Sequence, residues 1–413
     1  MKQIPRFKSS STVKELVKAA FPHEKIVSEG GDLEVFTKKF AQYIGASYAV
    51  PAPLARVALN AILCGLNLSQ KGEVILPSLT FHCIPAMFQK LGLKPRFVDI
   101  KPDTYCMDAD QLEEAITPST VAIVPVHLYG RACDMKTIME VAKRYNLAVI
   151  EDCAQSCGAV HSGKRLGSFG QGAIFSFHPH KNISVLGAGM LTTNSKEIAD
   201  KAVAWMKQFP IMSKAVLAKR ILYVIGMRFV TQPWFWNSLM APSLRFGAWA
   251  GVDMIELLTS ELPGWKGRSV KPSWLMPRSF HGRVGLSQLN TLDDLNNRRM
   301  HNGNQLLESL RNVPGVKIPS RASEGENVYS TFVVRVKDRQ GFRRRMRRFG
   351  VDTHGGNMFV GPHLPGLEGT GKCEIASEAI EHMVHLPVYP QMNEEDIKLV
   401  SEAVIKSISD KTY

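Results

Sequence analysis

The sequence predicts an α/β fold in which a large domain, built on a mostly parallel sheet, precedes a smaller α+β unit. Two observations support this prediction. Between about residues 34 and 194, short apolar runs alternate with helical patterns, which is typical of a sheet covered by helices on both faces. Most of the apolar runs are continuous rather than alternating, as expected for strands that are buried on both faces.

The individual elements follow from these runs and from the turn residues between them. The strands expected in the large domain are Glu73–Leu76, Arg96–Asp99, Val121–Val126, Ala148–Asp152, Ala173–Phe177 and Met190–Thr193. The helices expected there are Leu54–Leu66, which has Pro53 at its first turn, Gln111–Ile116 and Met135–Tyr145. The smaller unit should contain the strand Tyr329–Val336, the basic helix Gln340–Phe349 and the amphipathic helix Glu394–Ile408. We place the large domain at residues 1–295 and the small C-terminal domain at residues 296–413.

The composition is that of an ordinary globular protein, with 45% hydrophobic and 21% charged residues among 413. The seven cysteines are scattered and form no C-x-x-C pair. A disulfide framework and a zinc site are therefore disfavoured, and we expect no metal centre and a reducing compartment. The first residues are basic but precede no apolar core, so we expect a cytoplasmic protein without a secretory signal.

The net charge of +14 favours anionic partners. No helix-turn-helix, zinc-finger or RNA-binding signature accompanies the charge, so we expect no nucleic-acid partner. The most basic segment, RRRMRRF at residues 343–349, could contact nucleic acid or lipid. A solvated helical face is the commoner reason for such a run, and we favour that interpretation.

An insertion at about residues 209–273 has a different texture, in which aromatic and basic residues are mixed. Arg228, Pro233 and Pro242 interrupt its apolar run, which argues against a membrane-spanning helix. One interpretation is a patch for peripheral membrane contact on the inner face of the membrane, because aromatic and basic side chains suit a headgroup boundary. An oligomer interface or an active-site lid is the alternative, and the sequence does not decide between them. The residues concerned are Trp234, Phe235, Trp236, Trp249, Lys214, Lys219, Arg220, Arg228 and Arg245.

Three chemically active residues should meet at the carboxyl edge of the sheet, where open α/β sheets bind ligands. Asp152 ends one expected strand, Ser176 ends another, and Lys181 follows 29 positions after Asp152 (181 − 152). Pyridoxal phosphate (PLP) chemistry needs a lysine of lowered pKa, a carboxylate at the pyridine nitrogen and donors for the phosphate. Asp152 and Lys181 alone do not identify a PLP enzyme, because any α/β protein offers an aspartate and a lysine at such a spacing. A sugar-nucleotide dehydrogenase would also have a parallel sheet, but it should carry G-x-G-x-x-G after its first strand, and none is present there.

Four long segments, in the correct order, resemble the DegT/DnrJ/EryC1/StrS family of PLP-dependent sugar aminotransferases. They are EVILPSLTFHCIPAMFQKLGLKPRFVDI, IVPVHLYGRACDM, VIEDCAQSCGAVHSGKRLGSFGQGAIFSFHPHKN and GLSQLNTLDDLNNRR. The resemblance implies the type I aminotransferase fold, PLP as cofactor and a homodimer.

The resemblance also implies a role for each matching residue. Lys181 would hold PLP as a Schiff base and move protons, and Asp152 would pair with the pyridinium nitrogen. Gln155 would lie near the ring, Phe81 would stack on it, and Ser176 would donate to the phosphate. The family's dehydratase branch has histidine at the position of Lys181, so this chain resembles the aminotransferases.

Three departures from the family pattern stand out. A Ser-Gly-Thr motif usually opens the first helix and holds the phosphate, whereas this chain has Leu54, Ala55 and Arg56 there. Arg56 and the backbone at Ala55 could supply phosphate contacts in its place. The family's Asn-Tyr-Arg motif, a phosphate contact from the neighbouring subunit, is not recognisable near Trp274–Met276. The insertion is longer and more apolar than the family's usual connection.

Four histidines are candidates for substrate contacts: His178, His180, His354 and His363. Packing or turn formation explains each of them equally well. We expect a transaminase that moves an amino group from an amino acid, with glutamate favoured, to a keto-sugar that is usually nucleotide-linked. A lipid-linked acceptor is one alternative, and a non-catalytic sensor or scaffold with the same fold is another.

Overall fold

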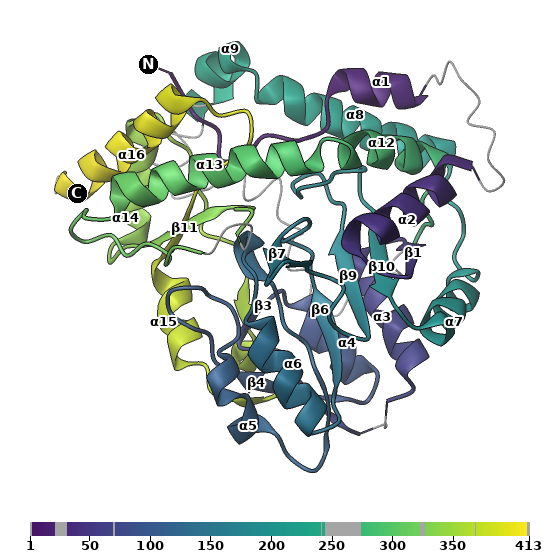
Figure 1. Ribbon diagram of the computed structural model, residues 1–413. Coiled ribbons are helices and arrows are strands. Elements are labelled where there is room, and N and C mark those ends of the chain that lie inside the picture. Colours follow the sequence, from purple (N-terminus) through teal and green to yellow (C-terminus); the bar gives the residue numbers. More distant parts are fainter. Residues whose placement is uncertain are drawn as a thin grey trace.

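The computed structural model describes residues 2–20, 31–68, 71–240, 242–243, 274–322, 327–367 and 369–410. Its centre is an eight-stranded sheet in the order β1-β10-β9-β6-β5-β2-β4-β13 (Figure 1). The strands, in that order, are Tyr48–Ala52, Gly189–Thr193, Gly172–Ser176, Ala148–Asp152, Thr120–Ile123, Glu73–Pro77, Lys94–Val98 and Thr370–Gly371. From β9 to β13 every neighbouring pair is parallel, whereas β10 is antiparallel to both β1 and β9. The predicted fold class is confirmed.

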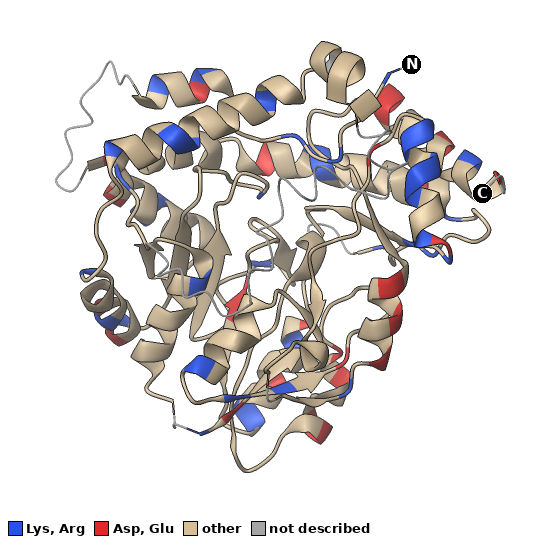
Figure 2. Ribbon diagram, turned by 180° about the vertical axis from the view of Figure 1, so that it is seen from behind, with Lys and Arg blue, Asp and Glu red and all other residues tan. Residues whose placement is uncertain are grey.

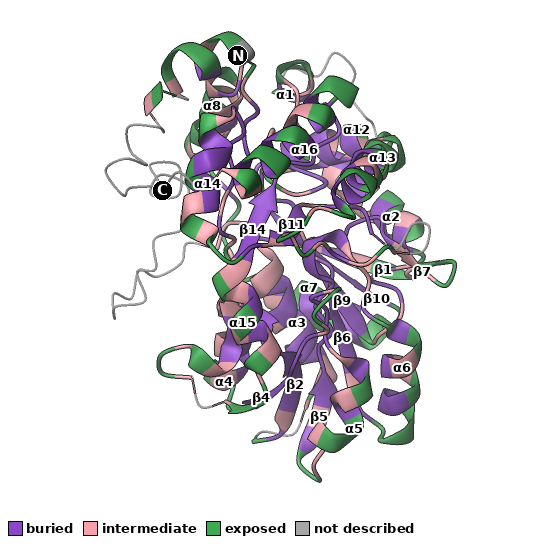
Figure 3. Ribbon diagram, turned by 90° about the vertical axis from the view of Figure 1, so that its left-hand side faces the viewer, coloured by how far each residue is buried: buried purple, intermediate pink, exposed green. Residues whose placement is uncertain are grey.

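Helices cover both faces of this sheet, as the continuous apolar strands predict. On one face Ile75 and Val149 pack with α2 (Gly31–Ile44), α6 (Met135–Arg144) and α12 (Ser279–Leu289). On the other face Val74 and Ile150 pack with α3 (Ala55–Leu66), α4 (Cys83–Lys90) and α7 (Lys196–Met206). Neighbouring strand residues thus enter opposite cores, because side chains alternate along a strand. Figure 3 shows the buried strands between the two helical layers.

A second core lies in the C-terminal part. The strands β11 (Phe332–Arg335) and β14 (Met383–Leu386) pair antiparallel and pack with α13 (Leu292–Leu310), α14 (Arg339–Arg348) and α16 (Glu394–Ser409). Leu292 belongs to the first core, whereas Leu306 and Leu310 belong to this one. The domain boundary predicted at residue 296 therefore falls inside the continuous helix α13 rather than in a linker. The N-terminal segment also joins this core, through a bridge between Ile4 and Val351.

Short elements complete the molecule. They are β3 (Leu79–Thr80), η1 (Ala109–Gln111), α5 (Leu112–Ala115), η2 (Leu128–Gly130), β7 (Val160–His161), β8 (Lys164–Arg165), β12 (Phe359–Val360), η4 (Gly361–His363) and α15 (Glu374–His382). β12 pairs with β3, and β13 adds to β4. The C-terminal part thus contributes β12, which pairs with β3, and β13, which is the outer strand of the large sheet beside β4.

The insertion begins with a helix that the sequence analysis did not expect. α8 (Lys214–Val230) runs for 17 residues and is followed by α9 (Pro233–Phe235) and the π-helical turn η3 (Trp236–Met240). Together with α1 (Val13–Ala20) they form the upper edge of the molecule in Figure 1. Trp249 and Arg245 lie outside the described residues. Among the described helices, none has both the length and the apolar character of a bilayer-spanning segment.

Two expectations need correction. The strand predicted at Val121–Val126 ends at Ile123, and Val126 forms only an isolated bridge with Asp152. The strand predicted at Tyr329–Val336 is the shorter β11.

The prediction that the arginine run at residues 343–349 forms a solvated helical face is also wrong, because Arg343, Arg345 and Arg347 of α14 are buried. Arg345 Nε donates to the carbonyl of Ser407 on α16, and Arg347 Nε donates to Asp352, which follows α14 in the chain. Arg344 and Arg348 are the two exposed members of the run.

Candidate active site

The strand register brings the predicted residues to one edge of the sheet. Ala52, at the end of β1, lies beside Gly189, which in turn lies beside Ser176 at the end of β9. Asp152, the last residue of β6, pairs with Ile174 on the neighbouring strand β9. α3 begins three residues after β1 ends, so its N-terminus opens at this same edge. The carboxyl edge of the sheet is the expected place for a ligand.

Lys181 and Asp152 face each other across this edge closely enough for each to influence the other's pKa. Desolvation lowers the pKa of Lys181, and the Asp152 carboxylate opposes that shift. Burial raises the pKa of Asp152, which the backbone N–H of Ala154 and the charge of Lys181 oppose. A lysine of lowered pKa is a better nucleophile at neutral pH, and the buried carboxylate stands ready for a cationic partner.

Phe81 and Gln155 belong to segments that adjoin this pair. Cys83, two residues after Phe81, is near enough to raise the pKa of Lys181. Phe81 is half-buried and contacts His82, with ring centroids 4.4 Å apart. Gln155 follows β6, and its side-chain oxygen accepts a 3.1 Å hydrogen bond from the N–H of Tyr129. This contact holds the Gln155 amide against the backbone of η2.

The N-terminus of α3 provides backbone donors for an anion. Leu54, its N-cap residue, is extended and gives no side-chain cap. Gly189 packs directly on this turn, since a Cβ there would lie 2.4 Å from the nitrogen of Ala55. Arg56 is half-buried and lies near enough to His178 to lower the pKa of that imidazole. An uncapped helix N-terminus with an arginine beside it suits a phosphate.

His178 and His180 precede Lys181 and have solvent-accessible side chains in the isolated chain. Desolvation by the surrounding protein, together with nearby cations, lowers the pKa of His178 to about 3. Desolvation and Lys181 lower the pKa of His180 to about 4. Both imidazoles are therefore neutral at pH 7 and can exchange hydrogen bonds with a ligand without adding charge.

The two C-terminal histidines have different surroundings. His354 stacks on the buried His385, with ring centroids 4.5 Å apart, and its pKa is lowered by desolvation first and by His180 among other groups. His354 thus lies on the side of the site that the small domain supplies. His363 is exposed, and its imidazole contacts the thiol of Cys373 at 3.6 Å. His354 thus lies near His180, which directly precedes the lysine, whereas His363 lies on the surface.

The loop that carries Lys181 is held from outside by residues that sequence reasoning did not assign. Arg220 of α8 donates to the carbonyls of Leu186 (3.1 Å) and Gly187 (2.8 Å). Leu186 has φ 67°, a left-handed conformation that a leucine adopts at a cost. The Arg220 contacts offset that cost, so α8 helps to shape the loop.

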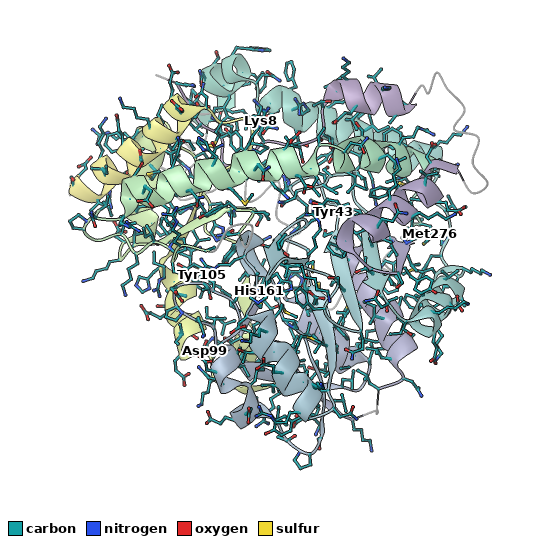
Figure 4. The ribbon with its side chains drawn as sticks, viewed as in Figure 1. Lys8, Tyr43, Asp99, Tyr105, His161 and Met276 are labelled. Atoms are coloured by element: carbon teal, nitrogen blue, oxygen red, sulfur yellow. The ribbon has the colours of Figure 1, made fainter. Side chains whose placement is uncertain are left out.

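The N-terminal segment lies on the same loop. The Ser10 hydroxyl donates to the carbonyl of Lys181 at 3.2 Å, and Phe7 meets the His180 ring edge to face. Arg228 of α8 donates in turn to the carbonyls of Ser9 and Ser11. Figure 4 labels Lys8 of this segment between α8 and α13. A local sequence pattern could not predict these contacts, because they join residues more than 170 positions apart.

One buried group near the site looks like a metal centre but has another purpose. His127, Glu151 and Cys153 offer ligand atoms within 4.8 Å of one another. Glu151, however, already accepts from the N–H groups of Gly167, Phe169 and Gly170 and from His127. Since the carboxylate is engaged in this way, the group serves to fix the loop after β8 under Asp152.

The residues at the sheet edge fit pyridoxal phosphate. The buried Asp152 carboxylate would suit the ring nitrogen, Lys181 would offer an amine for the aldehyde, Phe81 an apolar face, and Ser176 with the start of α3 donors for the phosphate. Fold and site together define a PLP-type aminotransferase.

Comparison with known proteins places the chain more closely. The model of the DegT/DnrJ/EryC1/StrS aminotransferase family matches residues 8–227 and 278–405. The chain belongs to this family, and the predicted resemblance is confirmed. The unmatched stretch in the middle is most of the insertion.

Similar proteins of full length support the assignment. A dTDP-3-amino-3,6-dideoxy-alpha-D-galactopyranose transaminase of Aneurinibacillus thermoaerophilus is 32% identical, over 91% of this chain and 90% of its own. GDP-perosamine synthase of Escherichia coli is 27% identical over all of both chains. The structure of ntda from Bacillus subtilis with bound cofactor PMP aligns with TM-score 0.72 and 24% identity, over 99% of this chain and 86% of that one. The predictions of an aminotransferase and of a PLP-type cofactor are thereby confirmed.

Proposed function

We propose that this chain is a PLP-dependent transaminase whose acceptor is a nucleotide-linked keto-sugar. The observation that carries the proposal is the buried Asp152 facing a Lys181 of lowered pKa at the carboxyl edge of the sheet. Two full-length relatives, by their names, make a dTDP-linked and a GDP-linked amino sugar, which supports this class of acceptor.

Each residue of the site then has a defined task. When bound, the cofactor supplies an electron sink for carbanionic charge at the substrate carbon. Asp152 holds a proton on the ring nitrogen, and its burial strengthens this interaction because the local dielectric is low. Lys181 carries the cofactor and moves a proton at the substrate carbon. Phe81 keeps the ring in place, and Gln155 lies beside it.

The phosphate would bind at the start of α3. The N–H groups at Ala55 and Arg56, the Arg56 guanidinium and the Ser176 hydroxyl would hold it, since the strand register places Ser176 at the same sheet edge as the residues before α3. His178, His180 and His354, neutral at pH 7, would contact the sugar by hydrogen bonds. His363 stays a more distant candidate, since it lies on the surface against Cys373.

The amino donor and the assembly are further parts of the proposal. We expect glutamate as the donor and a homodimer as the active form.

A product analysis tests the acceptor. Purified protein, PLP and glutamate are incubated with keto-deoxyhexoses linked to dTDP or to GDP, and mass spectrometry follows the amino sugar and the keto acid. We expect equal amounts of both products, and none with Lys181→Ala. The same sugars without a nucleotide are the matched control.

The outcomes separate the alternatives. If glutamate is converted but no nucleotide-linked sugar is aminated, the acceptor proposal fails while the transaminase stands. If wild-type protein converts no glutamate and no other amino acid, the chain is a sensor or scaffold instead.

A further inference from the structure

One edge of the molecule collects exposed apolar side chains. Of the thirteen large hydrophobic residues that are exposed in the described part of the chain, seven lie on α1, α8, α9 and η3. These helices form the upper edge in Figure 1, and Figure 2 shows Lys and Arg along the same edge from behind. We call the group the α1–α8 surface; it comprises Val13, Val17, Leu222, Tyr223, Phe229, Trp234 and Leu239.

α8 has an inner and an outer side. Leu217, Ile221 and Ile225 of the inner side pack against the large core. The outer side carries an exposed stripe at helical spacing, made of Lys219, Leu222, Tyr223, Gly226 and Phe229. A surface helix of a soluble protein normally has polar residues on this side. Leu222 is instead 67% exposed, and Trp234, just beyond the helix, 61%.

The exposed aromatic residues form a cluster at the C-terminal end of α8. The ring of Phe229 lies 5.3 Å from that of Trp234 and 4.9 Å from that of Phe235. Tryptophan and phenylalanine beside basic residues suit the boundary between lipid headgroups and acyl chains. The cluster therefore matches one end of an interfacial helix.

The charges of the same segment favour an anionic partner. Residues 201–240 contain six Lys or Arg and no Asp or Glu. Lys207, Lys214 and Lys219 are exposed among them, and α1 adds Lys14 and Lys18. Its only carboxylate, Glu15, accepts from the N–H of Thr12 at the start of the helix. A second copy of this surface would bring like charges together, whereas an anionic bilayer would neutralise them.

We propose that the α1–α8 surface docks on an anionic lipid bilayer, with α8 lying along the headgroup layer. The inner side of α8 holds the lysine loop through Arg220. Docking thus brings the active site close to the bilayer, where an acceptor that is carried by the membrane would be within reach. The docking itself does not depend on which acceptor the enzyme uses.

Flotation of the purified holoenzyme tests the proposal. Vesicles of phosphatidylcholine with phosphatidylglycerol are compared with vesicles of phosphatidylcholine alone. We expect the wild type to float with the anionic vesicles, less so at high salt, and to stay behind with the neutral ones. Leu222→Asp with Trp234→Asp should lower the bound fraction about tenfold or more, as should Lys214→Glu with Lys219→Glu.

Matched variants on α16 serve as controls. Ile405→Asp replaces a residue that is 43% exposed, and Lys398→Glu reverses an exposed charge; both should float like the wild type. Visible absorbance of bound cofactor verifies that each variant is folded, and light scattering gives its oligomeric state. Equal flotation of all proteins, or no flotation of the wild type, overturns the proposal. If Leu222→Asp with Trp234→Asp breaks an oligomer instead, the surface is a contact between copies and the lipid proposal is wrong.

Discussion

At the scale of single residues, the site depends on charges that are placed where water is scarce. Asp152 is almost completely buried, and Lys181 is partly buried. Desolvation lowers the pKa of Lys181. The two groups stabilise each other's charged forms, but not enough to cancel desolvation, since the pKa of each is shifted in the direction that burial dictates. Neighbouring groups with shifted pKa values are typical of catalytic positions.

Asp152→Asn tests the role of the carboxylate. The amide keeps the shape but cannot hold a proton on the ring nitrogen, so we expect kcat to fall by about 10² to 10³ while the cofactor stays bound. Single-turnover rates and the absorbance spectrum measure the two effects. The exposed Asp110→Asn is the control and should leave kcat unchanged. An active Asp152→Asn enzyme would refute the assigned role.

The lowered pKa of Lys181 predicts how the stability of the cofactor-free protein depends on pH. The folded state binds this proton less tightly than the unfolded state, whose pKa is near 10.5. The charged lysine therefore destabilises the fold below its folded pKa, and the penalty disappears as pH rises towards 10.5. Lys181→Met should accordingly be more stable than the wild type at neutral pH, by a margin that shrinks in alkaline buffer. Thermal unfolding of both proteins across this range measures the margin, and a constant margin contradicts the prediction.

At the scale of elements, two helices hold loops by arginine side chains. α8 fixes the lysine loop through Arg220, and α14 buries three arginines, of which Arg345 donates to Ser407 on α16. The core strands and most helices could be predicted, because apolar periodicity is a local property. The partners of these arginines could not be predicted, because Arg345 and Ser407 are far apart in sequence and meet only in the folded chain.

Arg220→Met tests the support that α8 gives to the site. The two lost carbonyl contacts should free the turn at Leu186, weakening PLP binding and lowering stability by about 1 to 2 kcal/mol. Cofactor titration and urea unfolding check both effects. The neighbouring Lys219→Met changes a side chain on the outer side and should do neither. Equal PLP affinity in the two variants would show that the loop does not need α8.

α14 offers an internal comparison between buried and exposed arginines. Arg345→Met removes donors for Ser407 and for Asp338, and should cost about 2 kcal/mol in free energy of unfolding. Arg344→Met, one residue earlier and exposed, should change it by no more than about 0.5 kcal/mol. Urea unfolding of the two variants decides. Equal effects would favour the solvated face that the sequence suggested.

At the scale of the whole molecule, the sheet edge organises function. Asp152, Ser176 and the start of α3 come to one edge because β9 and β6 end side by side and β1 ends at the same edge, across β10. The sequence allowed these residues to be named, since strand ends and motif order are visible in it. It did not reveal that the N-terminal segment crosses the lysine loop, nor that His354 and His363 diverge, because both depend on how the C-terminal part folds back.

The most direct test of the account is to locate the covalent attachment of the cofactor. Protein reconstituted with PLP is reduced with borohydride, digested, and its peptides are analysed by mass spectrometry. We expect one modified peptide, with pyridoxyl phosphate on Lys181, and the loss of the visible absorbance band in Lys181→Ala. Absence of a labelled peptide in the wild type, or a label on another lysine, would contradict it.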